Sequence, residues 1–155
     1  MDAKPQKANR SARWWQIVLW LFFAYLYWQI LGFNQGNISN PILAGMYFIE
    51  FGIHEAGHIV FGFLPQIWVA AAGSLSEVGF TILLTFAALR AKSYRAAIFA
   101  LLWFMLAMHS MGTYMADARA QLLPLVGPGP DPMHDWHFVF GQLGWLNADV
   151  MIGTT

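Results

Sequence analysis

The chain has 155 residues, of which 58% are hydrophobic and only 10% are charged, against about 25% charged residues in soluble domains. Its formal net charge is zero, and no basic patch or nucleic-acid motif is present, which argues against nucleic acid as a partner. Cysteine is absent, so disulfides and thiolate metal sites are excluded, and any metal must be held by His, Asp or Glu. This composition is typical of an integral membrane protein.

A polar, basic tail of residues 1–13 precedes a membrane domain at residues 14–116. About twenty residues of helix span the hydrocarbon core of a bilayer. The sequence contains four apolar runs of this length, at residues 14–33, 41–64, 67–89 and 96–116. Pro41 suits the first turn of the second run, where its missing N–H costs nothing. We therefore expect an all-α integral membrane protein with about four transmembrane helices.

Residues 117–155 differ in character from the preceding runs. A Pro- and Gly-rich stretch at 123–130 cannot be regular helix and predicts an ordered or re-entrant loop. Asp131 and Pro132 then resemble an N-cap followed by proline at the first helical position. The helix that they would start, about 132–146, is too short to span, so we expect an interfacial or re-entrant helix that completes the site.

Basic residues orient the chain weakly if all four runs cross. With a cytoplasmic N-terminus, five basic residues lie inside (Lys4, Lys7, Arg10, Arg13 and Arg119) and three lie outside (Arg90, Lys92 and Arg95). Positive residues favour the cytoplasmic side. We therefore expect a multi-pass protein of a bacterial-type inner or plasma membrane with its N-terminus in the cytoplasm.

The most informative motif is His54-Glu55-Ala56-Gly57-His58, inside the second apolar run. On a helix, an HExxH segment places two imidazoles one turn apart, where both can bind one Zn²⁺, and leaves the glutamate beside the metal-bound water as a general base. Ionisable groups are costly in hydrocarbon, so their presence there indicates a functional site.

A catalytic zinc site needs a third protein ligand and an open position. The densest supply of ligands is at the start of the C-terminal helix, where His134 and His137 are three residues apart and share a face. We expect one of these two to complete the site with His54 and His58. Further acidic and histidine side chains are expected as alternative ligands or as groups that orient the ligands: Glu50, Glu77, His109 and Asp135. Glu50, one turn before His54, is well placed to accept a hydrogen bond from it.

The motif resembles that of the site-2 protease family of intramembrane zinc metalloproteases. His54, Glu55 and His58 match the family's HExxH in a membrane helix, and residues 69–75 are similar to the small-residue segment that opens its next helix. The resemblance covers about residues 50–84. It implies that the histidines bind zinc, that Glu55 activates water, and that the substrates are membrane proteins or peptides. The family's later Asp-Gly motif has no counterpart here, so the His134–His137 cluster would replace it.

Two other functions fit the same residues. A small non-enzymatic subunit of a larger membrane complex could ligate haem or a pigment, for example through His54 and His109, without a need for Glu55. A non-haem iron or di-metal oxidase could draw its carboxylates from Glu50, Glu55, Glu77 and Asp135, although their spacing matches no di-iron signature.

Overall fold

The computed structural model describes residues 10–33, 35, 38–125 and 132–154, and all regular secondary structure in this part of the chain is helical. The helices are α1 (Arg10–Leu31), α2 (Pro41–Val60), α3 (Gln66–Arg90), α4 (Tyr94–Ala116), α5 (Asp135–Leu143) and α6 (Asp149–Gly153), with a 3₁₀ turn at Leu146–Ala148. The all-α prediction is confirmed. Most of the predicted Pro- and Gly-rich loop, and Asp131 with it, lies outside the described residues.

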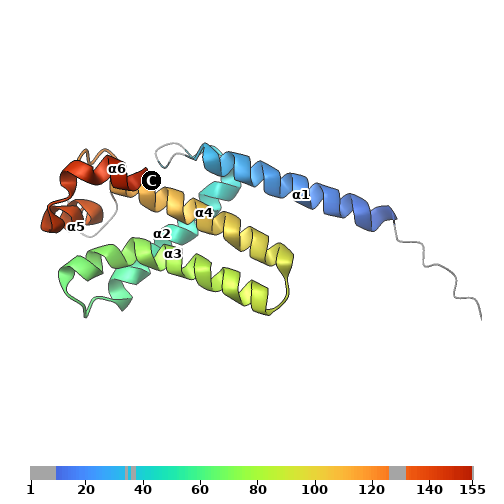
Figure 1. The fold of residues 1–155 in the computed structure, drawn as a ribbon, viewed down its shortest axis with the longest axis horizontal. Coiled ribbons are helices and arrows are strands. Elements are labelled where there is room, and N and C mark those ends of the chain that lie inside the picture. Colours follow the sequence, from blue (N-terminus) through green and yellow to red (C-terminus); the bar gives the residue numbers. More distant parts are fainter. Residues whose placement is uncertain (1–9, 34, 36–37, 126–131, 155) are drawn as a thin grey trace, which may run out of the picture.

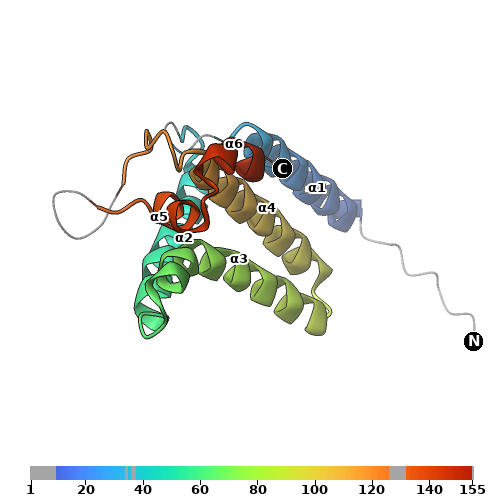
Figure 2. The ribbon, with the colours of Figure 1, turned by 60° about the vertical axis from the view of Figure 1, so that its left-hand side comes forward.

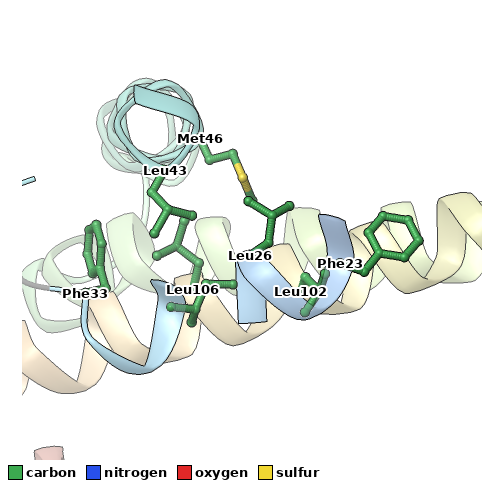
Figure 3. Close-up of a cluster of buried hydrophobic side chains, with 8 residues drawn as sticks. Phe23, Leu26, Phe33, Leu43, Met46, Leu102 and Leu106 are labelled. Atoms are coloured by element: carbon green, nitrogen blue, oxygen red, sulfur yellow. The ribbon is translucent and has the colours of Figure 1, made fainter. Parts of the chain in front are cut away.

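Three helices lie along one direction and one lies across them (Figures 1 and 2). α3 and α4 form an antiparallel hairpin, and α1 runs parallel to α4. Gln35, just after α1, donates a hydrogen bond of 2.9 Å to the carbonyl of Ser110 near the end of α4, so the two helices finish side by side. α2 crosses α1 and α4 steeply and is seen end-on where these two run across the view (Figure 3).

A hydrophobic core joins α1, α2 and α4 (Figure 3). Leu26 and Leu106 are completely buried, and Leu43 and Met46 of α2 pack onto them from above. α2 begins at Asn40, whose side chain accepts hydrogen bonds from the backbone N–H groups of residues 42 and 43, with Pro41 in the first turn as the sequence predicts. The cap and the core together fix where α2 enters the bundle.

Three helical segments are long and apolar enough to cross a membrane, at Trp14–Leu31, Gln66–Arg90 and Tyr94–Ala116. They expose large apolar side chains, including Trp15, Trp28 and Leu83, as a lipid-facing surface would. α2 is not among them because two glutamates and two histidines interrupt its apolar sequence. The structure thus supports a membrane protein with three such helices, one fewer than expected.

The C-terminal helix is shorter than expected. It begins at Asp135, three residues after the predicted start at Pro132, and its N-cap is His134. It ends at Gly144, which adopts a left-handed conformation with φ of 70° that favours glycine. The later start makes His134 the N-cap and Asp135 the first residue of the helix.

Small residues bring α2 and α3 into close contact. A Cβ atom added at Gly57 would lie 2.5 Å from Ser76 Oγ and 2.6 Å from the carbonyl oxygen of Ala72. A Cβ atom at Gly73 would lie 2.5 Å from the ring of His54. Such approaches are available only to glycine. The two glycines therefore set the position of the HExxH helix on α3.

We predict that Gly57→Ala destabilises the protein by about 1–3 kcal/mol, because the added methyl group meets the α3 backbone. The measurement is thermal unfolding in detergent followed by circular dichroism. The matched control is Gly52→Ala on the same helix, where a Cβ atom meets nothing within 4 Å. Equal effects of the two substitutions would show that α2 does not pack on α3 through Gly57.

Candidate metal centre

The two histidines of the HExxH motif aim the same ring nitrogen at one point. His54 and His58 lie one turn apart on α2, and their Nε2 atoms are 3.0 Å and 3.3 Å from Oδ2 of Asp135. These three residues form the group of potential metal ligands found in the described part of the chain, with ligand atoms within 4.8 Å of one another. Ligands about 2.0 Å from a tetrahedral Zn²⁺ would be separated by about 3.3 Å, so the spacing suits such an ion.

The other ring nitrogen of each histidine is already engaged. Nδ1 of His54 lies 2.6 Å from Oε1 of Glu77 on α3, and Nδ1 of His58 lies 2.8 Å from the carbonyl oxygen of Val69. A carbonyl can only accept, so Nδ1 of His58 carries the proton. Such contacts orient metal-binding imidazoles and leave Nε2 for the metal. Both histidines are therefore held in the orientation that metal binding requires.

The protonation states of the ring nitrogens also favour a cation between the two histidines and Asp135. When Glu77 is ionised, both Nδ1 atoms donate, and the contacts of both Nε2 atoms with Asp135 then need either two further protons or a metal ion. Two imidazolium ions crowded on one carboxylate oxygen repel each other in an apolar setting. A divalent cation replaces the two protons with the same total charge and binds both nitrogen lone pairs. The donor set thus fits a divalent metal of the zinc type.

Asp135 reaches the histidines because α5 is anchored on two other helices. Its backbone N–H donates to the Tyr114 hydroxyl at 3.1 Å, and that hydroxyl donates back to Oδ2 at 3.3 Å. The next residue, Trp136, donates its indole N–H to Ser74 Oγ of α3 at 3.1 Å. Burial alone would raise the pKa of Asp135, but the hydrogen bonds from His54 and His58 outweigh it and lower that pKa. Asp135 is therefore held as a carboxylate.

The expected histidine ligands of the C-terminal segment have other partners. His134 caps α5 by accepting from the backbone N–H of His137 at 3.2 Å, and its Nε2 lies 3.4 Å from Asp117. His137 donates through Nδ1 to the carbonyl of Ala118 at 2.8 Å. Neither histidine belongs to the ligand group, and the aspartate between them takes the place expected of them.

Glu50 and His109 also lie apart from the ligand group. Glu50 is 1% exposed, and neither of its oxygens has a hydrogen-bond partner among the described residues, so Glu77 has the role expected of Glu50. His109 is on the exposed side of α4, against the ring of Phe33. A haem held between His54 and His109 finds no support in this arrangement.

A cavity of about 700 Å³ opens over the three ligands, and Glu55, half-buried, lines it with them. This volume lies within the usual range of ligand-binding pockets. The cavity leaves a side of the ligand group accessible, as a catalytic metal site requires. Tyr114 also lines the cavity and was not predicted as a site residue from the sequence. The feature that could have indicated it is a hydroxyl group within an apolar helix, because a buried hydroxyl needs a hydrogen-bond partner.

No protein-family model matches this chain, and no match was found among curated proteins or solved structures. The resemblance to site-2 proteases therefore depends on the HExxH segment and its surroundings alone.

We predict that alanine at His54 or His58, or asparagine at Asp135, abolishes stoichiometric zinc binding by the purified protein, measured by elemental analysis. Each change removes a ligand or its charge. The matched control is His137→Ala, two residues from Asp135, which should keep its zinc because its ring faces Ala118. Zinc loss in the control with retention in Asp135→Asn would restore the histidine as third ligand.

We predict that Glu77→Gln weakens zinc binding by about 10–100-fold, because the carboxylate orients His54 and increases its basicity. The measurement is competition with a chromogenic chelator. Glu50→Gln is the control, since Glu50 is the carboxylate that the sequence alone favoured for this role. A larger loss in Glu50→Gln than in Glu77→Gln would assign the role to Glu50.

Proposed function

We propose that this protein is a zinc-dependent metallohydrolase of the membrane, a peptidase that cleaves membrane-protein substrates. The observation that carries the proposal is the convergence of two Nε2 atoms on Asp135 while both Nδ1 atoms are held by other groups. His54, His58 and Asp135 would hold the ion, giving two imidazoles and one carboxylate, a ligand set typical of catalytic zinc. A zinc ion there supplies Lewis acidity, which polarises a carbonyl and makes water more acidic.

Glu55 is the residue of this chain that moves the proton. It stands between the two histidines on α2 and lines the same cavity, so it can reach a water molecule that attacks a substrate carbonyl. The carboxylate takes the proton from that water and passes it to the departing amine, so the peptide bond breaks without a free hydroxide or amide ion. The cavity would hold the scissile segment of the substrate against these residues.

We propose a peptide substrate because the motif resembles that of site-2 proteases. We place the protein in a membrane because three of its helices are long and apolar enough to cross one. We propose a multi-pass protein of an inner or plasma membrane with a cytoplasmic N-terminus. With nine and five residues, α5 and α6 are too short to cross, and we place them at the interface with the bilayer. The alternative is a non-enzymatic subunit of a larger membrane complex.

We predict that Glu55→Gln loses about 10²–10⁴-fold in cleavage rate and keeps its zinc, because the substitution preserves shape and removes the base. The measurement compares cleavage of single-span model substrates in the same liposomes, with zinc content determined on each sample. Glu50→Gln is the matched control on the same helix and should cleave at the wild-type rate.

Equal cleavage by wild type and Glu55→Gln would exclude the proteolytic mechanism. No cleavage by either protein, with unchanged assembly into a host complex, would favour the subunit instead.

A further inference from the structure

The α3 and α4 residues beside the metal centre lie in the same half of the bundle. Val69, Gly73 and Glu77 stand in the first half of α3, and Tyr114 stands in the last turn of α4. The α3–α4 connection is at the opposite end. Tyr114 is about 30 Å from it at 1.5 Å per residue, which is about the thickness of the hydrocarbon core.

The mouth of the cavity is at the same end as the metal centre. Its lining includes residues just beyond the ends of helices: Gln35 after α1, Leu123 and Pro124 after α4, and Met133 before α5. Gln66, the first residue of α3, also contributes. The cavity therefore opens to the surface where α1 and α4 end and α3 begins.

Most basic residues belong, by their position in the sequence, to segments at the other end of the long helices. Lys4 and Lys7 precede α1 in the sequence, outside the described residues, and Arg10 and Arg13 belong to its first turn. Arg90, Lys92 and Arg95 belong to the α3–α4 connection, and Arg119 follows α4. α1 is parallel to α4, so the start of α1 is on the same side as the α3–α4 connection (Figures 1 and 2). Arg119, at the metal end, is paired with Asp149 at 3.2 Å.

The directions of the helices are consistent with a chain that crosses the membrane three times. α1 runs toward the metal end, α3 away from it, and α4 toward it again (Figure 1). α2 starts where α1 ends and finishes where α3 starts, both on the metal side, so its steep course needs no crossing of its own. With three crossings, seven of the eight basic residues fall on one side. With four crossings the division is five to three, so the rule that positive residues stay in the cytoplasm is met far better by three.

We infer that α2 lies across the bundle without spanning the membrane, and that the metal cavity opens on the non-cytoplasmic side. Four crossings with the same N-terminus would place the cavity at the cytoplasmic surface. The identity of the substrate, unlike the orientation, rests on the proposed function. The substrate is the segment of a membrane-anchored polypeptide that lies at or just inside the non-cytoplasmic surface. Cytoplasmic segments of the same polypeptide cannot reach the metal.

Single-cysteine labelling tests this inference, because the chain has no native cysteine. Met133→Cys probes the mouth of the cavity, and the native methionine side chain is 50% exposed. Ser93→Cys probes the α3–α4 connection, where the native serine is exposed and its side chain makes no capping hydrogen bond. Each variant is produced in bacterial spheroplasts and treated with a membrane-impermeant maleimide before and after permeabilisation. Ala107→Cys, at a completely buried position, is the control and should label only after denaturation.

We expect Met133→Cys to label in intact spheroplasts and Ser93→Cys to label only after permeabilisation. The reverse pattern overturns the inference, as it places the cavity in the cytoplasm. Labelling of both in intact spheroplasts also overturns it, because α4 would then not cross. So does protection of both, because the cavity would then not open outward. The pattern does not depend on metal: absence of zinc from the same samples would refute the proposed function and leave the orientation standing.

Discussion

Two histidines inside an apolar helix bundle need polar partners, and this constraint shapes the whole site. Leaving an ionisable side chain unpaired in such surroundings costs several kcal/mol. His54 meets the constraint with a carboxylate at each ring nitrogen, and His58 meets it with a carbonyl and the same aspartate. The partners come from two other helices, Glu77 and Val69 from α3 and Asp135 from α5, so satisfying two imidazoles brings α3 and α5 together around α2.

α3 is the platform on which this arrangement is built. Its first half supplies the glycine surface under the His54 ring, the carbonyl of Val69, the hydroxyl of Ser74 that receives Trp136, and the carboxylate of Glu77. These groups are on a regular helix, so their relative positions follow from helix geometry and not from loop conformation. A rigid support of this kind suits a site whose ligands must stay within a fraction of an ångström of their places.

The four long helices and the pairing of the two histidines can be predicted from the sequence because both depend on local periodicity. The i, i+4 spacing of His54 and His58 needs only a helix, and the cap at Asn40 and Pro41 is local too. The position of Asp135 beside the two histidines was harder to predict, since it depends on where α5 begins. Once His134 caps the helix, its side chain is turned back to its own backbone, and the next residue faces α2. The direction of α2 depends on contacts such as Gly57 with Ala72, which no local pattern encodes.

The separation of the ligands along the chain has a consequence for conformational entropy. His54 and Asp135 are 81 residues apart, and α3 and α4 lie between them. An ion held by both would act as a cross-link that closes a long loop, and closing a long loop removes more freedom from the unfolded chain than closing a short one. Binding of the ion would then be coupled to folding of the C-terminal segment, so we expect the order of α5 and α6 to depend on the ion more than that of the long helices does.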